Sequence, residues 1–328
     1  MTVFTYSQAR RNLAAVLERA KKEGKVLIKR KDGSLFALYP ETPSADVSYL
    51  YHYTTAEGLK GIAEENRIRA TNIFYMNDSE ELRGGLRLFE NKLEELASTH
   101  EIYSQALREI RSWFLGEGQG LSLERTVQIY ACCFSEKKDV LSQWRAYCPE
   151  GGFAVGFRRS KVEALVKGED LALSRCLYRR DEQLARINAI LDDIRAEALQ
   201  SDEAVGSQPN VAQDSRYFEI IDAHMFEIIR TAATFKHIGF HEEAEWRVMT
   251  TLQRAERPGE LKSRVRKGRL VPYREISLNG SMWEDAHIVV APGAPRELVL
   301  EAARRLLWHS RPESGTATFE ASDTPYRH

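Results

Sequence analysis

The chain has 328 residues and a formal net charge of −1 at pH 7. This length can bury a substantial core and can form more than one domain. The balanced charge excludes a general attraction to nucleic acid or membranes, so any such contact must come from a local patch. There is no run of about 18 apolar residues, and the first twelve residues lack the apolar core of a signal peptide. We therefore expect a cytoplasmic protein with no membrane partner.

The first forty residues predict a small β-α-β-β unit. Ser7 is a suitable N-cap for a helix that ends at Gly24, and this helix repeats apolar residues at i, i+3, i+4 and i+7: Leu13, Val16, Leu17 and Ala20. An Asp-Gly pair at 32–33 between two apolar runs, 25–30 and 34–39, indicates a β-hairpin. So small a unit cannot bury enough surface alone, and we expect it to dimerise or to dock on another surface.

Three segments of this unit, Phe4–Arg10, Leu13–Leu17 and Val26–Gly33, closely resemble the start of the Phd/YefM antitoxin family. That family is a homodimeric β/α fold that binds operator DNA through its N-terminal region and wraps its toxin with a C-terminal tail. Here a short polar linker at 41–48 replaces the tail. The resemblance implies a homodimer through residues 1–40 and basic residues that contact operator phosphates, namely Arg10, Arg11, Lys29 and Arg30. An ordinary charged surface is the alternative.

The second part of the chain opens with a predicted strand at 49–53, followed by a helix. The residues Thr54-Thr55-Ala56-Glu57 form a capping box, so His52 is expected where the strand meets a helix N-terminus. Free N–H groups at such a place favour a polar or anionic ligand, whereas a structural histidine is the alternative. Asn77 and Asp78 are predicted to cap the next long helix.

Buried strands are then predicted from the apolar runs 128–135, 151–157 and 288–290. The dense basic run Lys262–Arg269 is typical of a solvated hairpin or of a channel for a nucleic-acid or phosphate-bearing substrate. The cysteines contain no CxxC pair, so we expect buried reduced thiols, with a catalytic cysteine as the alternative: Cys132, Cys133, Cys148 and Cys176.

The rest of the chain is predicted to be organised around the motif Glu243-Ala244-Glu245-Trp246-Arg247. In an extended strand, Ala244 and Trp246 would face a core, while the two carboxylates and the guanidinium would share the other face and line a cleft. Alternatively, the charged residues could form the solvent-exposed face of an edge strand, which is an equally strong interpretation. If the segment were helical, these residues would be spread around the helix axis.

A metal site is a further alternative for this region. His237 and His241 stand at i and i+4 beside Glu242, as in metalloprotease motifs. Gly239 lies between the two histidines, and Glu245 occupies a position where the motif requires histidine. We therefore predict no metal.

From residue 49 to the end, the order of the motifs resembles a widespread bacterial family of uncharacterised domains. The motifs are His52-Tyr53-Thr54, Asn77-Asp78, Cys133-Phe134-Ser135, Trp144 with Tyr147, Gly151-Gly152-Phe153 and Glu243 to Arg247. That family is similar to the ADP-ribosyltransferase fold, and the strand–His-Tyr-Thr–helix opening resembles DarT-type DNA ADP-ribosyltransferases. The resemblance implies an α+β protein in which an antitoxin-like module at 1–40 precedes a mixed α/β transferase-like domain at 49–328.

The resemblance also implies residue roles and NAD as the substrate. His52 would hold the NAD ribose, Ser135 or a nearby aromatic residue would support the nicotinamide pocket, and Glu245 would perform the chemistry. Glu243 would orient or deprotonate the acceptor, and Arg247 would bind the pyrophosphate or pair with a glutamate. The NAD site would comprise His52, Tyr53, Thr54, Asn77, Asp78, Ser135, Trp144, Tyr147 and Arg247.

Together these features predict a fused toxin–antitoxin or phage-defence protein. Its large domain would transfer ADP-ribose from NAD to a nucleic acid or a protein, and its N-terminal module would restrain it. The alternative is a catalytically inactive transferase-like fold that serves as a DNA-binding regulator.

Overall fold

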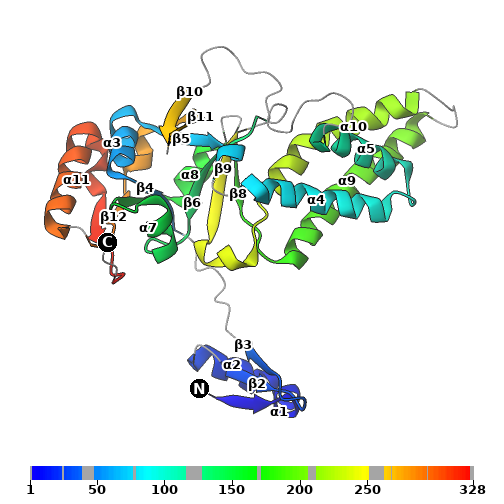
Figure 1. Ribbon diagram of the computed structural model, residues 1–328, viewed down its shortest axis with the longest axis horizontal. Coiled ribbons are helices and arrows are strands. Elements are labelled where there is room, and N and C mark those ends of the chain that lie inside the picture. Colours follow the sequence, from blue (N-terminus) through cyan, green and yellow to red (C-terminus); the bar gives the residue numbers. More distant parts are fainter. Residues whose placement is uncertain are drawn as a thin grey trace. The chain divides into compact units, whose positions relative to one another are not determined.

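The computed structural model divides the chain into two compact units, Met1–Val47 and Ser48–His328 (Figure 1). Each unit has a hydrophobic core of its own. The described residues are 2–23, 26–38, 48–76, 79–115, 128–167, 171–205, 212–250, 262–266, 268–293 and 295–325. Of the linker predicted at 41–48, only Ser48 lies within them.

The first unit is a three-stranded sheet with two helices. Its elements are β1 (Val3–Thr5), α1 (Tyr6–Arg11), α2 (Leu13–Glu23), β2 (Val26–Lys29) and β3 (Leu35–Leu38). Strand β2 pairs in parallel with β1 and antiparallel with β3. The turn of the predicted hairpin contains Gly33 at φ 85°, a conformation that glycine adopts without strain.

The helical part of this unit differs from the prediction in two details. It consists of two helices, and its N-cap is Thr5 instead of Ser7. The Thr5 hydroxyl accepts from the N–H of Gln8, while the Gln8 side chain accepts from the N–H of Thr5, which completes a capping box. Ser7 lies inside the first helical turn because the preceding threonine already satisfies that end.

The second unit combines one large sheet with helices on both sides. Its strands are β4 (Tyr49–Thr54), β5 (Arg67–Asn72), β6 (Tyr130–Ser135), β7 (Phe153–Arg158), β8 (Leu171–Arg175), β9 (Glu245–Thr250), β10 (Lys262–Arg266), β11 (Arg269–Ser277), β12 (His287–Val290) and β13 (Thr318–Ala321). Its α-helices are α3 (Ala56–Glu65), α4 (Ser79–Leu96), α5 (Glu101–Leu115), α7 (Leu141–Tyr147), α8 (Arg159–Leu165), α9 (Arg180–Val205), α10 (Ala212–Ala232) and α11 (Arg296–Ser310). Short 3-10 helices cover Ile73–Tyr75, Ile238–Glu243, Gly280–Trp283 and Pro312–Thr316.

These ten strands form a single mixed sheet. The main path runs β10-β11-β5-β6-β4-β7-β12-β13, and a branch adds β9 to β6 and β8 to β9. Within it only β12 and β13 are parallel. The predicted α+β class is confirmed.

The sheet forks at β6. On one edge, β6 pairs with β9 from Ala131 to Ser135. On the other edge it pairs with β5 only at its start and with β4 only at Ser135, opposite Tyr51. Strands β5 and β4 therefore diverge from β6, and the stretch around Cys133 borders a gap in the sheet. This gap positions the candidate site.

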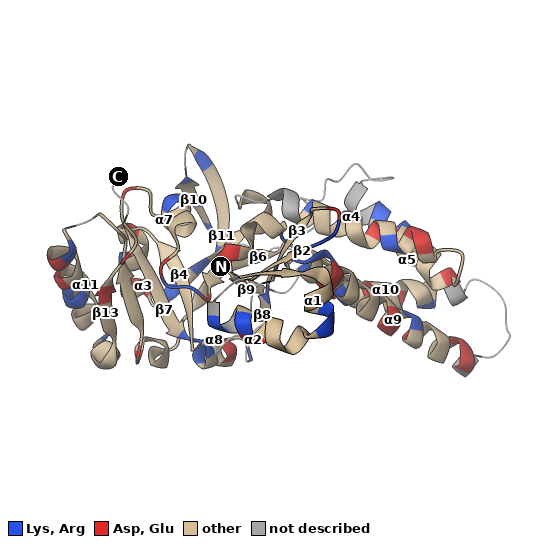
Figure 2. Ribbon diagram, turned by 90° about the horizontal axis from the view of Figure 1, so that it is seen from below, with Lys and Arg blue, Asp and Glu red and all other residues tan. Residues whose placement is uncertain are grey.

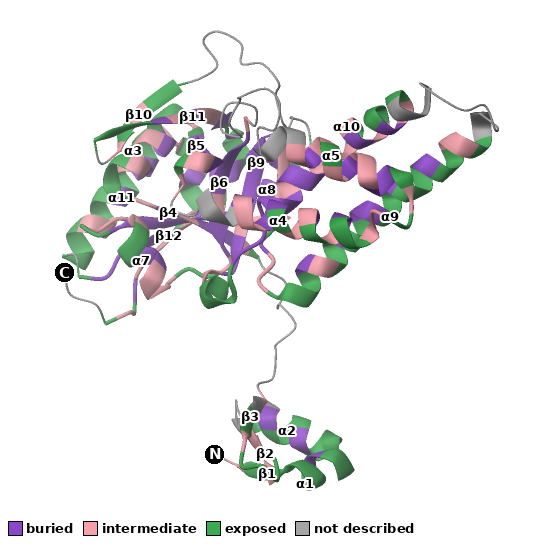
Figure 3. Ribbon diagram, turned by 45° about the vertical axis from the view of Figure 1, so that its right-hand side comes forward, coloured by how far each residue is buried: buried purple, intermediate pink, exposed green. Residues whose placement is uncertain are grey.

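The largest apolar core lies under helices α4, α5, α9 and α10, which gather on one side of the unit (Figure 1). Leu86, Ile190 and Ile229 pack there against Ala131 of β6 and Met249 of β9. Figure 3 shows the central strands β6 and β9 as buried and the outer strand β10 as mostly exposed. Within the described residues, no helix is both long enough and apolar enough to cross a membrane.

Candidate functional site

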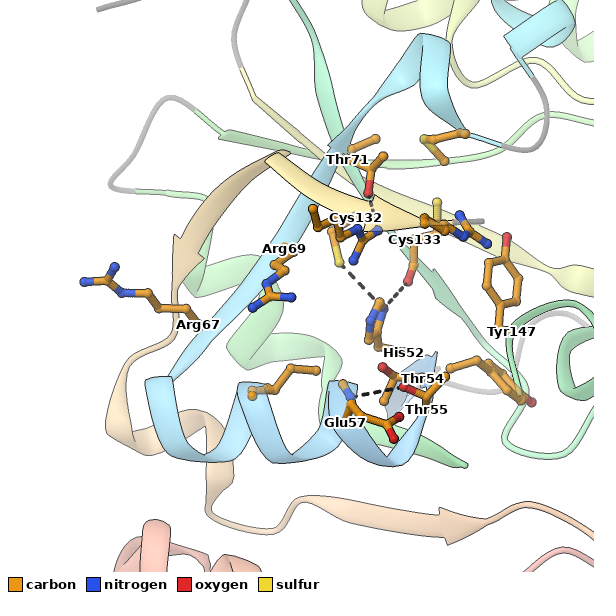
Figure 4. A pocket seen from close by; sticks show the side chains of 18 of the residues that line it. His52, Thr54, Thr55, Glu57, Arg67, Arg69, Thr71, Cys132, Cys133 and Tyr147 are labelled. Atoms are coloured by element: carbon orange, nitrogen blue, oxygen red, sulfur yellow. Dashed lines mark hydrogen bonds between the residues drawn. The ribbon is translucent and has the colours of Figure 1, made fainter. Parts of the chain in front are cut away.

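A cavity of about 410 Å³ opens at the fork of the sheet (Figure 4). Its walls come from the end of β4, the first turns of α3, strand β5, strand β6 and the basic strand β10. Tyr147 and Glu245 also line it. A smaller hollow of about 40 Å³ is lined by several of the same residues, among them His52, Tyr147 and Glu245.

His52 occupies the gap between β4 and β6. Its Nδ1 atom lies 2.9 Å from the carbonyl oxygen of Cys133, and its ring packs at 5.8 Å from the ring of Phe134. A carbonyl oxygen can only accept, so Nδ1 carries the proton. Burial, helped by the charge of Arg264, lowers the pKa of His52, which keeps the ring neutral. Within the described residues its other nitrogen, Nε2, has no partner and is a free acceptor.

The start of α3 forms the floor next to His52. Thr55 caps the helix by accepting from the N–H of Gly58, so the cap is the second threonine of the predicted box. Thr54 packs closely on this turn, because a Cβ atom at Gly58 would lie 1.9 Å from its Oγ1 atom. Tyr53 is also among the residues that line the cavity, and its hydroxyl donates to the Lys137 carbonyl and accepts from the Val140 N–H.

Glu245 lies at the start of β9 and is held by two cations. Its Oε1 atom accepts from Nε of Arg247 at 2.7 Å, and its Oε2 atom accepts from Nζ of Lys236 at 2.6 Å. Burial alone would raise the pKa of Glu245, but the charges of Arg247 and Lys236 outweigh it and lower the pKa to about 2. Glu245 is therefore a buried, permanently ionised carboxylate that borders the cavity.

The prediction that Glu243 shares a strand face with Glu245 is wrong. Glu243 ends a 3-10 helix, and Ala244 turns the chain with a left-handed φ of 42° before β9 begins. The two carboxylates still share one partner, because Nζ of Lys236 also donates to Glu243 Oε2 at 2.5 Å. Trp246 was expected in a deep core, yet it is only partly buried and donates to Glu136 from its ring nitrogen.

Arg247 points away from any open space. Its side chain is 2% exposed, and it donates to Glu245 and to the carbonyl oxygen of Ala233. Of the two roles predicted for Arg247, the structure matches the pairing with a glutamate and not the binding of a pyrophosphate. Glu245 restrains its guanidinium, and neither cavity includes it.

Tyr147 and Trp144, both from α7, have different surroundings. The Tyr147 side chain lines the cavity near Cys133 and Glu245, and burial together with those neighbours raises its pKa well above the usual value. Trp144 is fully buried, donates to Asp139 and meets the ring of Tyr53 edge-on at 4.6 Å. Trp144 therefore supports the site from behind.

Ser135 is occupied by backbone contacts. Its hydroxyl donates to the carbonyl oxygen of Glu243 at 2.6 Å and accepts from the N–H of Lys137. It ties β6 to the turn before β9 and is not among the residues that line the cavity. Asn77 and Asp78 lie outside the described residues.

Four arginines lie together in the cavity wall, and the sequence did not predict this grouping. Arg67 and Arg69 come from β5, and Arg264 and Arg266 come from β10. Basic residues on β10 are visible in Figure 2. The dense run at 262–269 was the available signal, but its proximity to β5 depends on the intervening strand β11.

The other predicted residues lie elsewhere. His237 caps the 3-10 helix and His241 contacts the carbonyl oxygen of Ile238. No group of metal-binding side chains occurs in the described part of the chain. The cysteines are free thiols, and all but Cys133 are buried. In the first unit, the four basic residues predicted to contact operator DNA are exposed: Arg10, Arg11, Lys29 and Arg30.

Comparison with known proteins gives one family match. Residues 143–248 match the model of a family described as "Protein of unknown function (DUF2971)". The match runs from α7 to β9, so it includes Tyr147 and Glu245 but not His52, and it covers less than half of the chain. No curated protein and no solved structure is significantly similar to the chain. The chain is thus similar to this uncharacterised family over its middle third.

Proposed function

We propose that residues 49–328 transfer ADP-ribose from NAD to a macromolecule, within a fused toxin–antitoxin or phage-defence protein. The observation that carries the proposal is the pairing of His52 and Glu245 in one cavity. His52 offers a neutral acceptor nitrogen that can bind a sugar hydroxyl, and Glu245 offers a carboxylate held ionised. The cavity volume is within the usual range for small-molecule sites.

The residues suit cleavage of a glycosidic bond that leaves positive charge on a sugar. A fixed carboxylate stabilises such a transition state more than the ground state. The Glu245 carboxylate borders the cavity, where Arg247 and Lys236 hold it in a fixed orientation. The Tyr147 hydroxyl, which lines the same cavity, is available to position the ligand.

The antitoxin-like module supports a role in toxicity or defence. We propose that it forms a homodimer, binds operator DNA through Arg10, Arg11, Lys29 and Arg30 and restrains the enzyme. Because one fold can host many functions, the proposed activity depends on the chemistry of the site.

One observation favours a second candidate. Lys236 and Arg247 together neutralise Glu245 and Glu243, which weakens the field that a catalytic carboxylate would supply. The competing proposal is a ligand-binding, catalytically inactive domain that serves a DNA-binding regulator.

Nicotinamide release from NAD and transfer of labelled ADP-ribose to DNA, RNA and protein test the two proposals. We expect His52→Asn to lower kcat/KM by roughly tenfold, because the amide still donates to Cys133 but the Nε2 acceptor is lost. We expect Glu245→Gln to lower it by roughly a hundredfold or more. The matched control is Glu242→Gln, which changes an exposed glutamate three residues away. If neither the full-length protein nor a protein that lacks residues 1–47 releases nicotinamide or transfers label, the enzyme is excluded.

Thermal unfolding of each variant must accompany these rates. Glu245→Gln leaves Lys236 and Arg247 with less compensating charge, so a loss of activity could reflect a loss of folded protein. His52→Asn disturbs no ion pair among the described residues and is therefore the cleaner test of the site.

A further inference from the structure

Two arginines of the cavity wall approach the same aromatic ring. The guanidinium carbon of Arg69 lies 5.0 Å from the centre of the Tyr273 ring, and that of Arg264 lies 6.0 Å from it. Arg264 also donates from Nη2 to the hydroxyl of Thr71 at 2.9 Å, which fixes its fork over β5. Strand β11, which carries Tyr273, thus brings charges from β10 and β5 together.

Arg264 has no counter-charge within the described residues. Its Nε atom is buried without a hydrogen-bond partner. The neighbouring cations differ: Arg67 and Lys262 both contact Glu275, at 2.7 and 2.8 Å, and Arg69 reaches Glu65 at 3.9 Å. Burial and the charges of Arg266 and Arg69 lower the pKa of Arg264, so its charge is destabilised in the folded protein. A guanidinium keeps its proton at any ordinary pH, so a bound anion would offset this cost.

We propose that Arg264, with Arg69 and Arg266, binds a phosphate group of a nucleotide in the cavity. The guanidinium fork matches the geometry of phosphate oxygens, and Thr71 and Tyr273 hold it in place before the ligand arrives. His52 supplies an acceptor for a hydroxyl in the same cavity. A ligand that carries both an anion and sugar hydroxyls satisfies both groups.

This inference deepens the proposed function in that it places the ligand in the same cavity, but it needs no catalysis. The phosphate can belong to a free dinucleotide or to the end of a nucleic-acid strand. Both sources present the same chemistry to Arg264, and binding measurements separate them.

Isothermal titration calorimetry of the full chain tests the site with five probes: ADP-ribose, NAD, adenosine, and a short oligothymidylate with and without a 5′-phosphate. We expect wild type to bind ADP-ribose or NAD more tightly than adenosine, or the oligothymidylate with a 5′-phosphate more tightly than the one without it. Arg264→Gln should lower the affinity for the phosphate-bearing probe by about 10- to 100-fold. Arg264→Lys keeps the charge but loses the paired N–H donors of the guanidinium, so it should cause a smaller loss of affinity.

The matched control is Arg269→Gln. Arg269 lies on the same hairpin, is exposed and does not line the cavity, so its replacement should change affinity by less than about twofold. Arg264→Gln should not lower the melting temperature of the free protein, because it removes an uncompensated charge. If it fails to fold, Arg266→Gln replaces it in the same comparison.

Equal weakening by Arg264→Gln and Arg269→Gln would overturn the proposal. It would also be overturned if ADP-ribose and NAD bound no more tightly than adenosine and the two oligothymidylates bound equally. Tighter binding of ADP-ribose and NAD identifies a dinucleotide, whereas a preference for the phosphorylated oligonucleotide identifies a strand end. Binding that depends on Arg264 without any nicotinamide release would sustain this inference and reject the proposed enzyme.

Discussion

The Nζ atom of Lys236 lies 2.6 Å from Oε2 of Glu245, and both side chains are buried. Glu243 and Arg247 extend this pair into a network with two charges of each sign. Complete, the network is neutral. If one member is removed, a buried charge is left without compensation, and such a charge is costly to keep away from water. The network therefore fixes the turn at Ala244 that delivers Glu245 to the cavity.

Lys236→Met should lower the free energy of unfolding by about 3–5 kcal/mol, because it leaves the buried carboxylate of Glu245 and the partly buried carboxylate of Glu243 with one cation. The control is Lys262→Met, whose exposed lysine contacts Glu275 and should cost less than about 1 kcal/mol. Urea unfolding at pH 7 measures both. A cost for Lys236→Met as small as the control's would show that the network adds little to stability.

Glu245 should make stability depend on pH in the acid range. Its folded pKa of about 2 lies below the ordinary value of 4.5, so its stabilising contribution is present above pH 5 and is lost as the pH falls toward 2. Between pH 7 and pH 3 this group should account for a loss of about 2 kcal/mol. Unfolding of Glu245→Gln at both pH values should show a correspondingly smaller difference, whereas Glu242→Gln should behave like wild type. Equal pH dependence in all three proteins would contradict the assignment.

Local features of the fold and of the site were predictable from the sequence. The hairpin of the first unit follows from an Asp-Gly pair. In the site, the position of His52 before a helix follows from an apolar run that ends in a threonine cap. Each depends on chemistry within a few residues, where turn and capping preferences decide the structure.

Long-range features were not predictable. Glu243 leaves the expected strand because Ala244 adopts a left-handed turn, a conformation that alanine does not favour by itself. Lys236, eight residues before Ala244, stabilises that turn through its ion pairs with Glu243 and Glu245. Arg264 reaches Thr71 across β11, and the two residues are 193 positions apart. No spacing rule along the chain reveals such a contact.

Two adjacent glycines of α4 should respond in opposite ways to alanine. A Cβ atom at Gly85 would lie 2.4 Å from the carbonyl oxygen of Ala232, so Gly85→Ala must push α4 away from α10 and should cost about 1–3 kcal/mol. At Gly84 nothing lies within 4 Å, so Gly84→Ala should stabilise the helix by about 0.5–1 kcal/mol. Thermal unfolding of the two variants compares them directly, and a Gly85→Ala variant as stable as Gly84→Ala would refute the close helix crossing.

The small unit should dimerise through an apolar surface. Val16 and Ala20 of α2 are buried, whereas Leu13 and Leu17, also one turn apart, are about half exposed. Its core of buried residues is small, and further apolar side chains are exposed: Val3, Tyr6, Leu35 and Phe36. Sedimentation of the full chain should show a dimer that Leu13→Ser with Leu17→Ser converts to a monomer. The control Leu298→Ser, at an exposed leucine of α11, should leave the dimer intact, and a monomeric wild type would exclude this surface as a dimer contact.

Removal of residues 1–47 should test whether the antitoxin-like module restrains the enzyme. The boundary at Ser48 separates two units with their own cores, so the truncated protein should retain its fold. A linker as short as Pro40–Asp46 spans at most about 25 Å, which keeps the module at an effective concentration on the order of millimolar. At that concentration even weak docking of the module on the second unit would be largely saturated. We therefore expect the truncated protein to release nicotinamide faster and to slow cell growth more than the full chain.

The dimer-disrupting leucine pair provides the matched comparison. If dimerisation helps to hold the module in place, this full-length variant should show part of the activation that truncation produces. If truncation leaves turnover and growth unchanged in a protein that is otherwise active, the module is a dimerisation and DNA-binding handle, and restraint within the chain is ruled out. Glu245→Gln in the truncated protein should abolish toxicity. Persistence of toxicity in that variant would separate growth inhibition from the chemistry of the cavity.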